Sequence, residues 1–238
     1  MSSTPSFDLV IRIALLRAHD DPNELVPNIW RRFRCSSEIN LDAFQDKIVQ
    51  PLMGWTRNYH TYYFQKSSTF YIQNKSAAVD AFGMHDSNVA QGKRLNPENF
   101  TLGDLLSNPN DSCFYAYDLG DHWYHKLTLE KAIRKSDIDE SDQEEMALFG
   151  KCAVLDGAMR CPAEDGEGGS TYQENILDAH PMLHTFANMR MLVLKSETLQ
   201  MYEDCSMRKS LVSPRLNKLF TMPCDRANRI VWGINHPT

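Results

Sequence analysis

The segment from Tyr115 to Glu130 constrains the fold most, because it has the pattern of two β-strands joined by a tight turn. Two runs rich in aromatic and β-prone residues flank the dipeptide Gly120-Asp121. A glycine at the first loop position is typical of the primed turns that connect antiparallel strands through two residues. The segment therefore predicts an antiparallel hairpin with Gly120 and Asp121 as its loop.

The register of the hairpin follows from that loop. Asp118 is expected opposite Trp123, and Ala116 opposite His125. Because side chains alternate along a strand, Asp118, Trp123 and His125 share one face with four further residues, Phe114, Ala116, Leu127 and Leu129. The other face carries Tyr115, Tyr117, Tyr124, Lys126 and Thr128. We expect the first face, which is the more apolar, to be buried.

Asp118 and His125 on that face are the first candidates for a functional site. The two residues are diagonal neighbours, a separation that long side chains can partly close. A carboxylate beside an imidazole can fix the orientation of the ring, as general acid–base catalysis requires. The alternative is structural: a core histidine whose burial is compensated by an aspartate. The sequence alone leaves both interpretations open.

The remaining patterns predict an α+β fold. Aliphatic or aromatic runs typical of strands occupy residues 7–16 and 29–35 and a second hairpin at 59–73, whose turn is expected near 66–68. N-cap residues mark three helix starts at Asn40, Thr101 and Ser170, the last two with Asp104 and Gln173 three positions later. Pro51 and Gly54 are expected to divide and end the first of these helices. We therefore expect a mixed, largely antiparallel sheet with packed helices.

The domain organisation is expected to be a single α+β domain over residues 1–180 with a basic C-terminal extension over 181–238. From Met207 onward the chain holds six basic residues and one acidic residue, although the net charge of the whole chain is −6. We expect this extension to dock on the acidic domain; contact with an anionic partner is the alternative.

The composition argues against several classes of protein. An acidic chain is not typical of a general nucleic-acid binder. No apolar stretch is long enough for a transmembrane helix, and Asp8 and Arg12 interrupt the apolar run near the N-terminus, which argues against a signal peptide. The six cysteines form no CxxC pair. We therefore expect a cytoplasmic protein with reduced cysteines and without a membrane partner.

Four blocks of residues together resemble the plasmid pRiA4b ORF-3-like proteins. They are Ile29-Trp30-Arg31-Arg32 after Pro27; Met53-Gly54-Trp55 with His60, Tyr62 and Phe64; Tyr115 to Glu130; and Leu155-Asp156-Gly157 with Arg160-Cys161-Pro162, Glu164-Asp165 and Tyr172. The resemblance covers about residues 7–180. It implies an α+β fold and brings His60, Glu164 and Asp165 forward as neighbours of the hairpin. It implies no particular reaction.

Two departures from the family pattern bear on metal binding. The family often has a second histidine where this chain has Tyr62, and usually a cysteine where this chain has Gly166. Histidines and carboxylates of the blocks could bind a metal ion in principle. Because these two candidate ligands are missing, we expect no metal, with a metal site as the less favoured alternative. The chain has no P-loop and no dinucleotide-binding glycine motif, so we expect no nucleotide cofactor either.

The favoured hypothesis is a cofactor-independent enzyme, such as an isomerase, cyclase or hydrolase, that moves protons on a small molecule in an aromatic pocket. The expected catalytic residues are His125, Asp118 and His60. The expected substrate-binding residues are Trp55, Tyr62, Phe64, Tyr115, Asp121, Trp123, Arg31, Glu164 and Asp165. Cys161 as a nucleophile is less favoured than an inert thiol. The alternatives are a non-catalytic module that binds a ligand or a protein, and a nucleic-acid accessory of a mobile element.

Overall fold

One mixed sheet organises the molecule. The structure is a computed structural model, and it describes residues 7–57, 59–72, 92–138, 140, 152–159, 161, 162, 164, 166 and 168–178. Within these residues the sheet has eight strands in the order β5-β4-β3-β6-β7-β1-β2-β8. The strands are β1 Phe7–Leu15, β2 Trp30–Ser36, β3 Tyr62–Lys66, β4 Thr69–Ile72, β5 Lys93–Leu95, β6 Ser112–Tyr117, β7 Trp123–Arg134 and β8 Cys152–Ala158. All neighbours pair antiparallel except β4 and β5, which are parallel.

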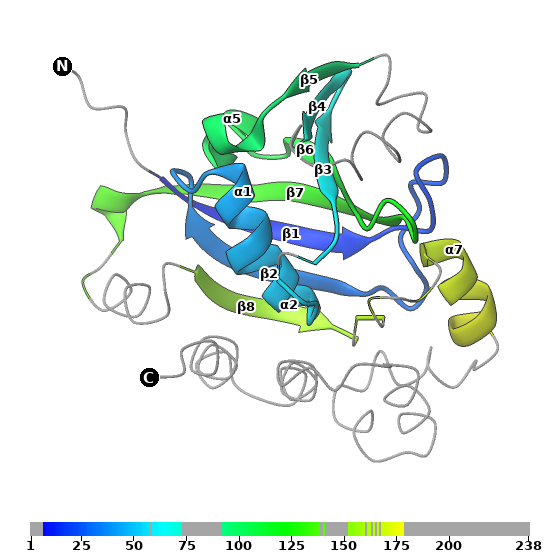
Figure 1. The fold of residues 1–238 in the computed structure, drawn as a ribbon. Helices are drawn as coiled ribbons and strands as arrows, with labels where there is room; N and C mark the ends of the chain where they lie inside the picture. The colour runs from blue at the N-terminus through cyan, green and yellow to red at the C-terminus, as the bar shows by residue number, and fades with distance from the viewer. Residues whose placement is uncertain are drawn as a thin grey trace, which may run out of the picture.

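A broken helical segment lies across one face of this sheet (Figure 1). It consists of α1 Leu41–Phe44, a π-helical turn Gln45–Val49 and α2 Gln50–Met53. Asn40 caps α1 by accepting a hydrogen bond from the Ala43 N–H, and Gly54 ends α2 with a φ of 79°. The other helical elements among the described residues are α5 Leu102–Leu105, α7 Gly168–Tyr172, a π-helical turn Gln173–Asp178 and the 3-10 turns Pro97–Asn99 and Lys135–Asp137. Together with the sheet, they confirm the predicted α+β fold.

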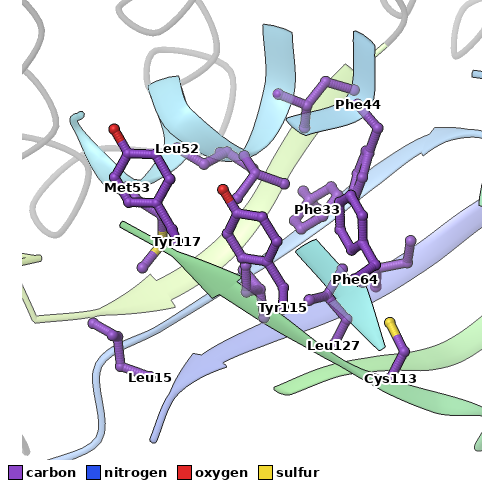
Figure 2. Packing of buried hydrophobic residues seen from close by; sticks show 14 of the residues in the cluster. Leu15, Phe33, Phe44, Leu52, Met53, Phe64, Cys113, Tyr115, Tyr117 and Leu127 are labelled. Carbon is purple, nitrogen blue, oxygen red and sulfur yellow. The ribbon is translucent and has the colours of Figure 1, made fainter. Parts of the chain in front are cut away.

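The main core lies between the sheet and this helical segment. Phe44 of α1 packs against Phe33 of β2 and Phe64 of β3, with ring centroids about 6 Å apart. Figure 2 shows Tyr115 and Tyr117 of β6 on the same side of the sheet, pointing towards Leu52 and Met53. A second, smaller cluster contains Tyr63, Phe70, Ile72, Ala116 and Leu119. Since Ala116 alternates with the two tyrosines along β6, this second cluster lies on the opposite face.

The predicted register of the hairpin 115–130 is wrong by one residue. Tyr117 pairs with Trp123 and Tyr115 with His125, so residues 118–122 form the connection instead of Gly120 and Asp121 alone. The Asp118 side chain explains the longer loop. Its Oδ1 accepts hydrogen bonds from the N–H groups of Gly120 at 3.0 Å and Asp121 at 3.3 Å, and its carbonyl accepts one from the His122 N–H. An aspartate that bonds the following amides starts a turn and leaves the strand.

This shift exchanges the two faces of β6. Tyr115 and Tyr117, expected on the outer face, point into the main core with Trp123 and His125. Asp118, expected beside His125 in the strand, lies in the turn. A slip of one residue moves every side chain of a strand to the other face, so an error in the loop length becomes an error in the site.

Other expectations are mixed in outcome. The strands over 7–16 and 29–35, the hairpin with its turn at Ser67-Ser68, and the Thr101–Asp104 capping box are confirmed. The cap at Ser170 is wrong: α7 begins at Gly168, and the Ser170 hydroxyl donates to the Arg17 carbonyl. β5 and β8 were not anticipated. Asp165 and the extension 181–238 lie outside the described residues.

Candidate functional site

A histidine and an aspartate pair at one end of the sheet. Nε2 of His60, which lies just before β3, is 3.3 Å from Oδ2 of Asp118 in the turn between β6 and β7. We call these two residues the rim pair, because the His60 side chain is partly open to solvent, with an exposed fraction of 24%. The Asp118 side chain beside it is largely buried, with an exposed fraction of 11%. The predicted Asp118–His125 pair is therefore replaced by an Asp118–His60 pair.

The turn fixes the Asp118 carboxylate. Oδ1 accepts from two turn amides, so Oδ2 is directed towards His60. The backbone of Asp118 is left-handed, with a φ of 56°, and that of His122 at the other end of the turn has a φ of 61°. Non-glycine residues rarely adopt this conformation, and such residues concentrate at functional sites. A carboxylate held in this way can orient an imidazole through its N–H.

Glu164 anchors a second group of side chains just below the rim pair. Its carboxylate accepts a hydrogen bond from the Tyr117 hydroxyl. The backbone N–H of Thr56 also donates to this carboxylate and lies 3.2 Å from Oε1 and 3.1 Å from Oε2. Its backbone carbonyl accepts from the Trp123 indole N–H at 2.9 Å. Burial, followed by the bond to Glu164, raises the pKa of Tyr117, so the phenol stays protonated and donates.

Trp55 completes this group, which we call the Glu164 cluster: Trp55, Thr56, Tyr117, Trp123 and Glu164. The Trp55 ring stacks on Tyr117 with centroids 4.8 Å apart, and its indole N–H donates to the Pro162 carbonyl at 3.0 Å. The His60 ring packs edge-on against Tyr117 from the outside, with centroids 5.6 Å apart. Tyr117 thus connects the rim pair to the buried cluster.

His125 is sealed in the core. Its exposed fraction is 0%, and Nδ1 lies 3.3 Å from the Tyr115 carbonyl. No hydrogen-bond partner for Nε2 exists among the described residues. Burial lowers the pKa of His125 to about 3, so the imidazole is neutral at physiological pH. His125 and Asp118 share no hydrogen bond or ion pair within the described part of the chain.

The other predicted substrate-binding residues are dispersed. Phe64 and Tyr115 are fully buried and pack on each other in the main core. The Tyr62 hydroxyl donates to Asp42 of α1 at 2.8 Å, away from the rim pair. Asp121 lies in the turn, where its carbonyl faces Gly168. These four residues support the fold around the site.

Arg31 belongs to a separate buried arrangement. Its guanidinium donates to the carbonyls of Leu52, Trp30 and Ala158 and to Sγ of Cys161, which is 3.2 Å away. Burial lowers the pKa of Arg31, whereas the Cys161 sulfur acts in the opposite direction. Arg31 therefore ties the end of β8 to α2 and does not join the rim pair.

Sequence reasoning missed the backbone N–H of Thr56, which donates to Glu164, and the backbone carbonyl of Pro162, which accepts from Trp55. No side-chain pattern marks a backbone donor, so only the neighbouring Trp55 and Glu164 gave a signal.

Among the described residues, no group of three or more histidines, cysteines and carboxylates has the arrangement of a metal site. None of the described helices combines the length and the apolar character that crossing a membrane requires.

Comparisons with known proteins place the chain in a family. A profile of the plasmid pRiA4b ORF-3-like proteins matches residues 21–194. The uncharacterized protein y4hQ of Sinorhizobium fredii (strain NBRC 101917 / NGR234) is 24% identical over 166 residues, which cover 69% of this chain and 70% of y4hQ. The crystal structure of a protein of unknown function, MM3350 from Methanosarcina mazei Go1, has a TM-score of 0.52 at 19% identity and shows the same fold, with 82% of this chain and 92% of that chain covered. Because the profile matches more than half of this chain, the chain belongs to the plasmid pRiA4b ORF-3-like protein family.

Proposed function

We propose that this protein is an enzyme that moves protons on a small organic molecule, with His60 as the general base or acid and Asp118 as the residue that orients it. The observation that carries the proposal is the rim pair: an imidazole nitrogen 3.3 Å from a carboxylate oxygen, partly open to solvent. His125 has no proton-transfer role in this proposal, since it is fully buried and neutral.

The chemistry follows from the geometry of the pair. If the Nε2–H of His60 donates to Asp118, Nδ1 carries the lone pair and becomes the basic nitrogen. The carboxylate stabilises the imidazolium that forms when Nδ1 accepts a proton. Hydrolysis, isomerisation and cyclisation can all use such a base. Tyr59, which is exposed and stacks edge-on against His60 with centroids 4.2 Å apart, is suited to contact a planar or apolar substrate.

Two chromogenic probes test this proposal: 5-nitrobenzisoxazole, whose ring opens when a base removes one proton, and p-nitrophenyl acetate, which reports hydrolysis. We expect catalysed turnover of at least one probe and a loss of about 100-fold in His60→Gln. His122→Gln is the matched control, because this exposed histidine lies in the turn that contains Asp118 and stacks on Tyr124. Equal rates for wild type and His60→Gln on both probes would contradict the proposal.

A non-catalytic binding module is the second candidate function, and the Glu164 cluster favours it. Glu164 accepts from Tyr117, Thr56 and Trp123, which is how a structural carboxylate that pins a loop is arranged. In that case the exposed Tyr59 would contact a ligand without any reaction. Tyr59→Ala would then weaken ligand binding. His60→Gln would change neither the rates measured with the two probes nor the thermal stability.

A further inference from the structure

Two cysteines lie directly opposite each other at one edge of the sheet. Cys35 of β2 pairs in register with Cys152, the first residue of the edge strand β8. Opposed residues of an antiparallel pair point to the same face. Both thiols belong to the main core and are fully buried and reduced. The fold therefore brings two residues far apart in the sequence to one buried location.

The spacing of such a pair suits a disulfide. Directly opposed residues in antiparallel strands have Cα atoms about 4.5 or 5.5 Å apart, depending on the hydrogen-bonding pattern. Disulfides span Cα separations of about 4.4 to 6.8 Å, so either pattern is compatible. Burial, followed by the neighbouring Cys152 sulfur, raises the pKa of Cys35, which agrees with two adjacent thiols.

The other described cysteines have different neighbours. Cys113 of β6 lies opposite Leu127. Cys161 follows β8 and contacts Arg31 and Met53. Among the described cysteines, only Cys35 and Cys152 are therefore paired by the register of the sheet.

We propose that Cys35 and Cys152 form a cross-strand disulfide when the protein meets a peroxide, and that this reversible modification ties β8 to β2. One thiol, as its thiolate, attacks a peroxide oxygen and becomes a sulfenic acid while the O–O bond breaks and one water leaves. The second thiol attacks that sulfur, forming the S–S bond and releasing a second water. Two thiols are oxidised, and one hydrogen peroxide is reduced to two waters.

The edge position provides access. β8 has one strand neighbour among the described residues, so it can separate from the sheet more easily than a central strand. In the closed sheet, burial raises the pKa of both thiols, so the reaction depends on this opening. Once formed, the bond holds β8 in place. β8 ends at Ala158, whose carbonyl accepts from Arg31, and leads into the segment that carries Glu164. Cys35 and Cys152 lie in a different part of the sheet from the rim pair, so their disulfide does not depend on the proposed enzymatic activity.

Peptide mapping of the full-length protein tests the proposal. The reduced protein is treated with hydrogen peroxide at pH 8, blocked with an alkylating reagent, digested without reductant and analysed by mass spectrometry. We expect a linked peptide that contains Cys35 and Cys152 and disappears with dithiothreitol. Because the bond closes a long loop, we also expect the oxidised protein to melt about 5 to 10 °C higher than the reduced one.

Cysteine variants provide the matched controls. Cys113→Ser removes a buried core thiol of the same kind and should leave both the linked peptide and the melting shift intact. Cys152→Ser and Cys152→Ala should each abolish the linked peptide and the melting shift. If a variant fails to fold, the peptide map of the wild-type protein still shows whether the disulfide forms. Thiols that stay reduced, oxidation to sulfinic acid, a link to another cysteine, or a link without a melting shift would each overturn the proposal.

Discussion

At the scale of single residues, His125 and His60 show how burial decides chemistry. The two imidazoles contact two rings that stack on each other: His125 packs against Trp55, and His60 packs against Tyr117. His125 has no solvent contact, and its pKa falls to about 3. His60 is partly exposed and has a carboxylate neighbour. The sequence singled out both histidines, but only the strand register separates them into a core residue and a rim residue.

The low pKa of His125 makes the stability of the protein depend on pH. In the unfolded chain, a histidine takes up its proton near pH 6.5, whereas the folded chain takes it up only near pH 3. Between these values the unfolded state binds more protons, so stability falls as the pH decreases. The largest slope from this residue is about 1.4 kcal/mol per pH unit.

Urea unfolding at pH 7.5, 6.0 and 5.0 checks this expectation. His125→Leu should remove most of this slope below pH 6.5. At pH 7.5 it should be less stable than wild type by about 1 to 2 kcal/mol, because the hydrogen bond between Nδ1 and the Tyr115 carbonyl is lost. His122→Gln, at an exposed histidine, should keep the wild-type slope. Identical slopes for wild type and His125→Leu would show that His125 does not titrate as inferred.

At the scale of elements, the sequence predicted those features that local signals define. Asn40, Thr101 and Gly54 act within a few residues of their own position, so their caps were predictable. The turn after β6 was not, because the side chain of Asp118 competes with the Gly-Asp dipeptide for control of the loop. β8 contains Asp156 and Gly157, which lack strand propensity, and pairing with β2 overrides that preference.

The turn provides a test of this competition. Asp118→Asn keeps a side-chain oxygen for the amides of Gly120 and Asp121 and tolerates the left-handed backbone. Asp118→Ala loses the acceptor and is strained at this φ. We expect Asp118→Ala to lower the free energy of unfolding by about 2 kcal/mol and Asp118→Asn by less than about 1 kcal/mol. Chemical denaturation measures both, and equal losses would mean that the side-chain bonds do not hold the turn.

At the scale of the whole molecule, segments that are distant in the sequence meet at one end of the sheet, where α7 lies (Figure 1). The loop before β3 contributes His60, the turn after β6 contributes Asp118, and the segment after β8 contributes Glu164. Their meeting depends on the strand order β3-β6-β7-β1-β2-β8, which requires pairings between remote strands. The hairpin pattern pointed to Asp118, and the resemblance to the family added His60 and Glu164, whereas neither could predict which of these residues would touch.

Two glycines in α7 allow this helix to approach the backbone after β1 and the turn after β6 closely. A Cβ atom at Gly169 would lie 2.2 Å from the Leu16 carbonyl oxygen and 2.6 Å from that of Arg17. At Gly168, where φ is +83°, a Cβ atom would lie 2.2 Å from the Asp121 carbonyl oxygen. Backbone atoms cannot yield as a flexible side chain can, so alanine at either position should push α7 away from the end of β1 and from the turn that holds Asp118.

We therefore expect Gly168→Ala and Gly169→Ala to destabilise the protein by about 2 kcal/mol or more and to increase amide exchange in residues 16–17 and 118–122. Glu174→Ala is the control, since this side chain is exposed in the helical turn that directly follows α7. Hydrogen exchange with mass spectrometry measures the local effect. If faster exchange were confined to α7, with no change in the turn, α7 would not support the rim pair. If the turn did respond, the position of the Asp118 carboxylate would depend on a helix some 50 residues later in the chain, and the activity proposed for His60 would be expected to fall with it.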